Sequence, residues 1–480
     1  MLTLQQASQW LTHAAPVGDM SVRVLRVVTD TRSLREGDLF VALKGDVFDA
    51  HDFLLQAKAL GAVAAVAEHG IAAAGLPGLE VADTRLALGE LAAGWRARFE
   101  VPLIAVTGSN GKTTVTQMIA CVLRAWKHDK AFATEGNFNN DIGVPLTLLR
   151  LTASHEVGVV ELGMNHPGEI AYLAKLVKPC VALINNAQRE HLEFMESVDA
   201  VADENAAVLA SLPTDGIAVF PADDTYTAQW RRLAGSRHVL TFAWRSEAPD
   251  ADITATAAWQ ADHWQVTAST PSGPLVFALH IAGRHNVKNA LAACACAVAA
   301  GVPLAAIAKG LSDFVAVKGR SRAVSLRVNE RLITLVDDTY NANPDSVQAA
   351  IEVLAELPSP RLLVMGDMGE VGNQGPRFHR EAGDLARSRR IDHLFTLGKQ
   401  SAYAQQAYGA AEGLTSHHFS DVDTLLAAVQ SVLPGINSVL VKGSRFMKME
   451  RVVQALEKQG FSSAQVSPTS SSSKEAPHAA

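Results

Sequence analysis

A glycine-rich segment at residues 107–114, with the sequence TGSNGKTT, most constrains the fold of this chain. The apolar run at residues 102–106 predicts a buried strand before it, and apolar residues recur at helical spacing over residues 115–126. Glycines at a strand-to-helix turn let the backbone wrap around an anion, and the helix start adds free N–H groups and partial positive charge. The segment therefore predicts a phosphate-binding loop in an α/β domain.

The side chains of this segment favour a nucleoside triphosphate over a turn that binds nothing. Lys112 can reach a β- or γ-phosphate, and the hydroxyl of Thr113 can bind Mg²⁺. Only two residues separate Gly108 from Gly111, where the usual phosphate loop has four. The residues expected around the nucleotide phosphates are Gly108, Ser109, Asn110, Gly111, Lys112, Thr113 and Thr114.

Composition and charge narrow the class of protein. With 480 residues, 48% of them hydrophobic, the chain can bury several cores. Its 42 basic and 49 acidic residues are well mixed, which argues against a dedicated nucleic-acid binder. A secretory signal is not expected, because residues 1–6 lack its basic start and apolar core. A membrane span is not expected either, because the most apolar window, residues 290–308, is mostly alanine and is interrupted by Gly301 and Pro303. Four cysteines without framework spacing fit a reducing cytoplasm.

The periodicity of the chain predicts three α/β domains and a tail. Strands and helices alternate over residues 99–316, which predicts a doubly wound parallel sheet with antiparallel strands on its flank, at residues 252–281. Residues 1–98 predict a small α/β domain, and residues 317–460 predict a second doubly wound, Rossmann-like domain. Residues 461–480, with their serine run, predict a disordered tail.

Polar side chains follow two predicted strands of the central domain. Glu161 ends the strand predicted at residues 156–162, and His191 lies beyond the strand predicted at residues 180–185. Active residues of parallel sheets gather beyond the carboxyl ends of the strands, and a carboxylate beside a phosphate site suits Mg²⁺. An ion pair for Glu161 and a structural role for His191 are the alternatives.

Two other polar groups leave alternatives open. Arg32, Lys44 and His51 lie near strand ends of the first domain, where they could hold an anionic ligand or face solvent as loop residues do. His285 and Asn289 are four residues apart and share one face of a predicted helix. An Asn amide there can bind an adenine edge, or the group can form a helix N-cap.

Further motifs extend over nearly the whole chain, from about residue 2 to residue 456. They are DTR at 30–32, LFVALKG at 39–45, FDAH at 48–51, EGNFNN at 135–140, ELG at 161–163, GRHN at 283–286, KGR at 318–320, DTYNAN at 338–343 and KGSR at 442–445. Together with the phosphate loop and His191, these motifs resemble those of the Mur ligases of peptidoglycan synthesis. The pair of asparagines at 139–140 and the run YNAN at 340–343 resemble the branch that adds D-alanyl-D-alanine.

The resemblance implies an ATP-dependent peptide ligase with a UDP-binding first domain, a central ATPase and a Rossmann-like C-terminal domain. ATP would phosphorylate the terminal carboxylate of UDP-N-acetylmuramoyl-tripeptide, and the amine of D-alanyl-D-alanine would attack the acyl phosphate. Lys112, Glu161 and His191 would be catalytic, with Mg²⁺ gathering the charge that develops. A cytoplasmic monomer without membrane insertion is expected.

The resemblance also implies contacts residue by residue. Those expected around ATP, beyond the phosphate loop, are His285, Asn289, Arg320, Asp338, Tyr340 and Asn341. Those expected around the UDP substrate are Thr31, Arg32, Lys44, Phe48, His51, Asn137 and Asn139. Those expected around the metal are Thr113, Glu161, His191 and Glu204.

One position departs from the family pattern. The family commonly carries a carbamoylated lysine shortly after the metal histidine, and its carbamate helps to hold a second Mg²⁺. Residues 202–206 read ADENA here, with Asn205 at the lysine position. Asp203 or Glu204 could supply the charge directly, and Glu204 is preferred for its longer reach. Without an amine to modify, activity is expected to be indifferent to bicarbonate.

Two other functions compete with this interpretation. A different Mur ligase or a folylpolyglutamate-type ligase shares the chemistry, but the first-domain loops favour a UDP-sugar substrate. A nucleotide-dependent switch would use the phosphate loop without ligation, and polar clusters at strand ends in three domains argue against it. The identity of the third residue of the tripeptide, diaminopimelate or lysine, is left open.

Overall fold

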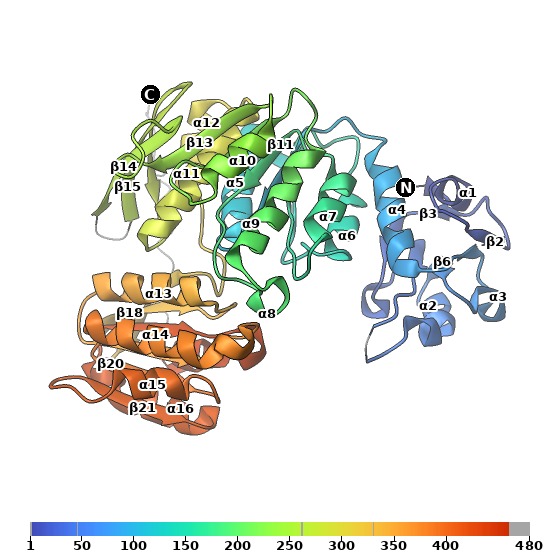
Figure 1. The fold of residues 1–480 in the computed structure, drawn as a ribbon. Coiled ribbons are helices and arrows are strands. Elements are labelled where there is room, and N and C mark those ends of the chain that lie inside the picture. The colour runs from blue at the N-terminus through green and yellow to red at the C-terminus, as the bar shows by residue number, and fades with distance from the viewer. Residues whose placement is uncertain (1, 46, 261–262, 330, 460–480) are drawn as a thin grey trace, which may run out of the picture. The chain divides into compact units, whose positions relative to one another are not determined.

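The computed structural model describes residues 2–45, 47–260, 263–329 and 331–459 (Figure 1). The predicted tail at 461–480 lies outside these residues. The chain divides into two compact units: the first runs to Val317 and includes Glu370–Asn373, and the second begins at Lys318. Within the described part of the chain, every helix is too short or too polar to cross a membrane.

A nine-stranded sheet forms the centre of the first unit, in the order β16-β15-β14-β13-β12-β11-β8-β10-β9. Neighbours from β9 to β14 pair in parallel, whereas β14, β15 and β16 pair antiparallel, which confirms the predicted flank. The strands are β8 (Leu103–Thr107), β9 (Ala131–Ala133), β10 (Val157–Glu161), β11 (Val181–Ile184), β12 (Ile217–Pro221), β13 (His238–Trp244), β14 (Ile253–Gln260), β15 (His263–Thr270) and β16 (Gly273–Leu279).

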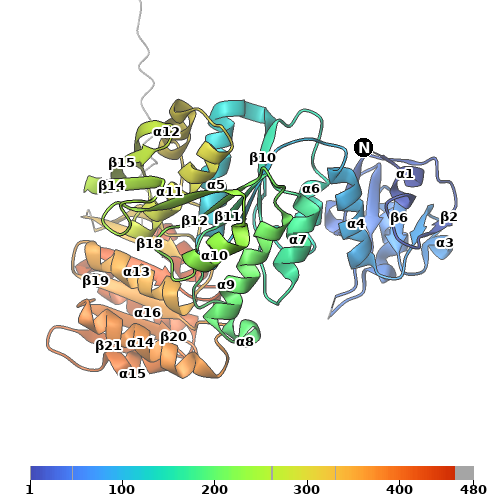
Figure 2. The same cartoon turned by 45° about the horizontal axis from the view of Figure 1, so that its top comes forward.

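Helices cover both faces of this sheet because the central strands are apolar on both sides (Figure 2). One face packs against α5 (Lys112–Lys127), α11 (Arg284–Ala299) and α12 (Leu304–Ser312). The other packs against α6 (Gly143–Leu148), α7 (Glu169–Val177), α9 (Val198–Ala206) and α10 (Thr227–Ala234). Strand β8 lies between β11 and β10, so the carboxyl ends of these three strands share one edge.

The N-terminal part of the first unit is a five-stranded sheet in the order β2-β7-β6-β5-β4. Its strands are β2 (Ala15–Val17), β4 (Arg26–Val28), β5 (Asp38–Val41), β6 (Ala62–Ala67) and β7 (Gly78–Glu80). Residues 23–28 do not form one strand, because the chain is interrupted at the exposed Leu25. Arg23–Val24 form β3, which pairs with β1 (Leu2–Thr3). A 3-10 turn, Ala50–Phe53, leads into α2 (Leu54–Ala59).

Helix α4 (Thr84–Arg96) follows this small sheet, and Asp83 caps it by accepting the N–H groups of Arg85 and Leu86. Its buried residues belong to the same apolar core as α6 and α7. The N-terminal and central parts of the first unit therefore share one continuous core.

The second unit is a six-stranded sheet in the order β17-β18-β22-β19-β20-β21, parallel except for the edge strand β17. The strands are β17 (Arg322–Val328), β18 (Arg331–Asp338), β19 (Arg361–Gly366), β20 (His393–Leu397), β21 (Thr415–Phe419) and β22 (Ser438–Lys442). The helices are α13 (Pro344–Glu356), α14 (Gly375–Ser388), α15 (Ala402–Tyr408), α16 (Val422–Val432) and α17 (Glu450–Gln459). This sheet confirms the predicted doubly wound fold of the C-terminal part.

Candidate active site

The glycine-rich segment forms a tight turn between β8 and α5. Gly108 and Gly111 have φ angles of 128° and 81°, a region that side chains disfavour. A Cβ atom on Gly111 would also lie 2.5 Å from Asn289 Oδ1 and 2.8 Å from Asn185 Nδ2. Both the backbone conformation and the close packing therefore require glycine at this position.

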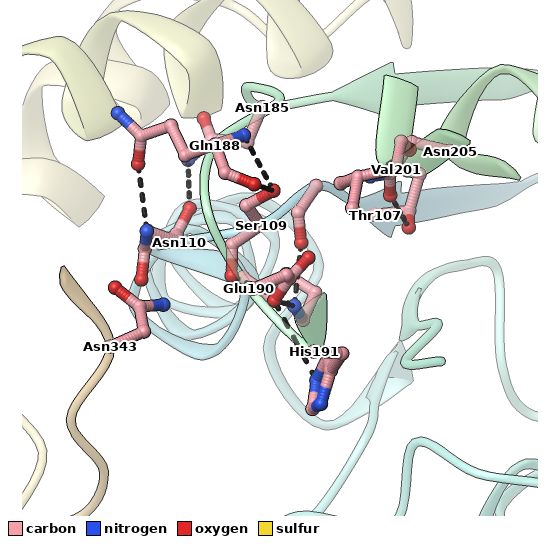
Figure 3. A network of polar contacts seen from close by, with 12 residues as sticks. Thr107, Ser109, Asn110, Asn185, Gln188, Glu190, His191, Val201, Asn205 and Asn343 are labelled. Atoms are coloured by element: carbon pink, nitrogen blue, oxygen red, sulfur yellow. Dashed lines mark hydrogen bonds and ion pairs between the residues drawn. The ribbon is translucent and has the colours of Figure 1, made fainter. Parts of the chain in front are cut away.

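A second segment, following β11, holds this loop in place (Figure 3). The N–H groups of Ser109 and Asn110 donate to the carbonyl and side-chain oxygens of Asn186, at 3.1 and 2.8 Å. Asn185 Nδ2 donates to Asn110 O at 2.7 Å, and Gln188 bonds to Asn110 Nδ2 and Ser109 Oγ. These bonds immobilise the loop backbone, and the part played by Gln188 was not predicted from the sequence.

Lys112 directs its ammonium group toward three acceptors. Its Nζ donates to Gly108 O at 2.5 Å, to Ser109 O at 3.0 Å and to Glu190 Oε2 at 3.1 Å. Burial raises the pKa of Glu190, while the neighbouring charge of Lys112 acts in the opposite direction. Glu190 was not predicted from the sequence, although its place beside His191, after a predicted strand, was a signal for it.

Glu161 lies at the end of β10, directly beside the start of α5. Its Oε1 accepts hydrogen bonds from Thr113 Oγ1 at 2.9 Å and from Asn139 Nδ2 at 2.8 Å. Its Oε2 is buried and has no hydrogen-bond partner among the described residues. A carboxylate oxygen with spare acceptor capacity next to a threonine hydroxyl fits a hard cation such as Mg²⁺.

Asn139, predicted to contact the substrate, bonds to Glu161 in this structure. Its amide nitrogen donates to Glu161, and its backbone carbonyl accepts the N–H of Gly163 at 2.7 Å; substrate contact stays a prediction. Asn137, the other predicted amide of this loop, has an exposed side chain. The structure thus assigns Asn139 to the orientation of Glu161 and leaves Asn137 facing solvent.

His191 caps α8 (Leu192–Met195) with a left-handed backbone, φ 48°. Its Nε2 lies 3.8 Å from Glu190 Oε2, and its side chain is 15% exposed. Glu190 lies beside His191 (Figure 3) and is paired with Lys112, so the three side chains form one cluster at the carboxyl edge of the central sheet.

Glu204, predicted to bind metal, has both carboxylate oxygens in hydrogen bonds, and its binding to metal stays a prediction. Its two carboxylate oxygens accept the backbone N–H groups of Gly168, at 2.8 Å, and Ile170, at 2.7 Å. A helix start presents such unpaired N–H groups with partial positive charge, so Glu204 stabilises the beginning of α7. Asp203, the other candidate, is exposed and accepts a hydrogen bond from Gln229.

Asn205, at the position aligned with the family's lysine, is fully buried. Its Oδ1 accepts from Thr107 Oγ1 at 2.7 Å, and its Nδ2 donates to Val201 O at 2.9 Å (Figure 3). Since Thr107 is the last residue of β8, this amide supports the beginning of the phosphate loop.

His285 and Asn289 both lie on α11, as predicted. The amide of Asn289 is buried: its Oδ1 accepts from Asn185 at 3.0 Å, and its Nδ2 donates to Asn286 Oδ1 at 3.0 Å. These bonds place the Asn289 side chain against the phosphate loop. Its contact with adenine remains a prediction.

In the second unit, the predicted residues gather at the carboxyl ends of β18 and β22. Asp338 Oδ1 accepts the N–H of Ser321 at 2.9 Å, and its Oδ2 accepts from Lys442 Nζ at 2.6 Å. Lys442 also donates to Asn341 O at 3.0 Å. The guanidinium of Arg320 lies over the Tyr340 ring at 4.0 Å, a cation–π contact. The motifs KGR, DTYNAN and KGSR therefore converge within this unit.

The predicted first-domain residues divide into exposed and buried side chains. Arg32 is 89% exposed and pairs with Asp30 at 2.6 Å, and Lys44 and Phe48 are exposed. His51 is buried: its Nδ1 bonds to Asp49 at 2.5 Å, and its Nε2 accepts the N–H of Glu68 at 2.9 Å. His51 therefore holds the loop together. Thr31, at the start of a short 3-10 turn, is half-buried.

A phosphate-loop turn at the carboxyl edge of a parallel sheet, with a carboxylate against its threonine, defines an α/β protein of the class that acts on nucleotide phosphates. Family models refine this class. The chain matches the Mur ligase family, catalytic domain, at residues 24–96, the Mur ligase middle domain at 106–297, and the Mur ligase, glutamate ligase domain, at 319–445. The chain belongs to the Mur ligase family.

Similar proteins extend over nearly the full length. The UDP-N-acetylmuramoyl-tripeptide–D-alanyl-D-alanine ligase of Escherichia coli K12 is 42% identical over 462 residues, 96% of this chain and 99% of that protein. The ligase of the same name from Haemophilus influenzae is 39% identical, over 95% and 98%. A crystal structure of MurF from Acinetobacter baumannii matches with a TM-score of 0.85 and 35% identity, covering 95% of this chain and 98% of that one. A MurF ligase from Thermotoga maritima in complex with ADP matches with a TM-score of 0.77 and 25% identity, over 91% and 98%.

Proposed function

We propose that this chain uses ATP and Mg²⁺ to join D-alanyl-D-alanine to UDP-N-acetylmuramoyl-tripeptide. One observation carries the proposal: 42% identity to the Escherichia coli ligase of that name, over 96% of this chain and 99% of that protein. Such coverage includes the phosphate loop, Glu161, His191 and the motifs of the second unit. The reaction places the protein in peptidoglycan precursor synthesis, and a cytoplasmic monomer is the proposed form.

The proposed reaction has two steps. A terminal carboxylate oxygen of the tripeptide attacks the γ-phosphorus of ATP, the bond to the β–γ bridging oxygen breaks, and ADP leaves. The dipeptide amine then attacks the acyl carbon, loses a proton, and phosphate leaves from the tetrahedral carbon. Both steps move negative charge onto phosphate oxygens, so positively charged groups fixed beside them lower the barrier.

The described residues fit this demand. Lys112 lies at the start of α5, where its ammonium group and the free N–H groups of the helix start would face the phosphates. Thr113 and Glu161 would hold Mg²⁺ through the hydroxyl and the buried Oε2, with His191 as a further candidate ligand. The bound metal ion would neutralise charge on the phosphates. Asn139 would keep the Glu161 carboxylate oriented through its 2.8 Å bond.

Contacts with the rest of the two large substrates are proposed by position. The exposed side chains of Arg32, Lys44 and Phe48, together with Thr31, would bind the UDP end of the substrate, with Asn137 on the peptide side. His285 and Asn289 would lie toward the base of ATP. Arg320, Asp338, Tyr340 and Asn341 of the second unit would contribute to the ATP phosphates and ribose. The proposed domain limits are residues 1–98, 99–316 and 317–460.

The direct test measures ATP hydrolysis and amide formation with each substrate alone and with both together. The proposal expects ADP, phosphate and UDP-N-acetylmuramoyl-pentapeptide to appear in equal amounts only when both substrates are present. Amide formation from a folate and glutamate would instead support a folylpolyglutamate-type ligase. ATP hydrolysis that is indifferent to both substrates would support a nucleotide switch. Using tripeptides ending in diaminopimelate and in lysine identifies the third residue.

A further inference from the structure

The Lys112 ammonium group has as many protein acceptors as it has N–H bonds. A lysine ammonium carries three N–H groups and no acceptor. Gly108 O, Ser109 O and Glu190 Oε2 lie 2.5, 3.0 and 3.1 Å from Nζ. A nucleotide phosphate oxygen would be a fourth acceptor, so its binding requires that one of the three protein acceptors release the lysine.

Of these three acceptors, Glu190 is the one that can move away from Lys112. The two carbonyls belong to loop backbone that the bonds from Ser109 and Asn110 to Asn186 hold in place. Glu190 contacts Lys112 only through a side chain, which can rotate. Its carboxylate also carries the same sign of charge as a phosphate, and like charges in a buried site repel each other strongly. Phosphate binding therefore acts against the contact between Glu190 and Lys112.

We propose that Glu190 is a positioning residue that competes with nucleotide phosphate for Lys112, so that nucleotide binding exchanges a carboxylate for a phosphate at the same ammonium group. The inference rests on the proposed binding of ATP at the phosphate loop. Glu190 is 5% exposed, its Oε1 is buried without a hydrogen-bond partner among the described residues, and Lys112 Nζ, at 3.1 Å from Oε2, is nearer to that oxygen than His191 Nε2, at 3.8 Å. The exchange lowers affinity for the product ADP and favours its release.

The test is the affinity for ADP, measured by calorimetry on the full-length protein and on Glu190→Gln. The substitution keeps the length of the side chain and removes its charge, so the Kd for ADP is expected to fall about tenfold, the worth of one charge-assisted hydrogen bond. The Kd for AMP, which lacks the β-phosphate that Lys112 would contact, is expected to change less than about twofold. A role for Glu190 in merely supporting the loop would raise both Kd values.

Two controls test whether the change in ADP affinity depends on the position of the removed charge and on Lys112. Glu193→Gln removes the same charge from an exposed neighbour and is expected to leave ADP affinity unchanged. In a Lys112→Ala background, Glu190→Gln is expected to give no gain, because the competition needs the lysine. A thermal melt checks that each variant folds. Should Glu190→Gln fail to fold, Glu190→Ala removes the acceptor and provides the same comparison.

The outcomes are distinguishable. If the unmodified protein does not bind ADP, the phosphate loop does not have its proposed function and the inference falls with it. If it binds ADP but Glu190→Gln binds with equal or lower affinity, the inference alone is overturned. An equal gain for AMP and ADP, or a gain that survives in the Lys112→Ala background, would show a general charge effect and would also overturn it.

Discussion

A single amide side chain, that of Asn139, orients the Glu161 carboxylate in this protein. Asn139 donates to Glu161 Oε1, the same oxygen that accepts from Thr113, and so directs the unpartnered Oε2 away from both. Groups that orient a metal ligand typically matter almost as much as the ligand itself.

We therefore predict that Asn139→Ala lowers kcat by about 10- to 100-fold and raises the Mg²⁺ concentration needed for half-maximal activity. Asn139→Asp should be more harmful, because it sets a second carboxylate against Glu161. Ligase assays over a Mg²⁺ series check this. Equal kcat values and Mg²⁺ requirements for Asn139→Ala and the unmodified protein would remove Asn139 from this role.

His379 is a residue whose burial couples protonation to stability. It is fully buried on α14, its Nε2 accepts the N–H of Met368 at 3.0 Å, and its Nδ1 donates to Gly375 O at 2.7 Å. Burial lowers the pKa of His379, because the charged ring is poorly solvated. In the unfolded chain this histidine has an ordinary pKa of about 6.5, so it binds the proton more readily there than in the folded chain.

The neutral ring thus contributes stability that is fully present above about pH 6.5 and is lost as the pH falls through the lowered pKa of the folded state. We predict that the free energy of unfolding falls less from pH 7.5 to pH 5 in the His379→Gln variant than in the unmodified protein. Urea unfolding at both values measures this. His417→Gln, at an exposed site in the same unit, serves as the control and should follow the unmodified protein. Parallel losses in all three proteins would contradict the prediction.

At the scale of elements, helix α7 depends on a carboxylate from α9. Gly168 and Ile170 lie at the start of α7, and their N–H groups both donate to Glu204, which is 9% exposed. This contact ties two helices together on one face of the central sheet. The two accepted N–H bonds offset the cost of burying this carboxylate.

We predict that Glu204→Ala destabilises the first unit by about 2 kcal/mol, because two buried N–H groups lose a charged acceptor. Glu204→Gln should cost less, since the amide retains one acceptor oxygen. The Mg²⁺ requirement of both variants should be unchanged. Thermal melting and a Mg²⁺ titration of activity measure the two effects. A raised Mg²⁺ requirement at unchanged stability would restore Glu204 as a metal ligand.

At the scale of the whole molecule, α4 joins the N-terminal sheet to the central domain. Trp95 is buried in the shared core, and its Nε1 donates to Leu151 O at 3.0 Å. Arg96 donates to Val177 O and Val101 O, both at 2.9 Å. The N-terminal part is therefore packed as a continuation of the central core.

We predict that Trp95→Ala lowers the free energy of unfolding of the first unit by about 3–5 kcal/mol, the cost of a large cavity. In calorimetry the transition of the first unit should move to lower temperature, while that of the second unit stays in place. Trp259→Ala, at a side chain 42% exposed on β14, is the control and should move neither transition appreciably. Equal shifts in both transitions would contradict the division into two units.

Patterns confined to short stretches were predictable from the sequence. The phosphate loop, the alternation of strands and helices, the strand at His263–Thr270 and the family all follow from neighbouring residues, because turn chemistry and periodicity are local properties. Glu161 at the end of its strand was predictable for the same reason.

Tertiary structure alone decided which partner each polar side chain takes. Glu204 has the reach and charge of a metal ligand, yet unpaired N–H groups 34 and 36 residues earlier in the chain bind both its oxygens. Glu190, 78 residues from Lys112, became part of the loop only through the parallel pairing of β8 and β11. A carboxylate binds the strongest donor within reach, and distance in space is set by the packing of the sheet and not by position along the chain.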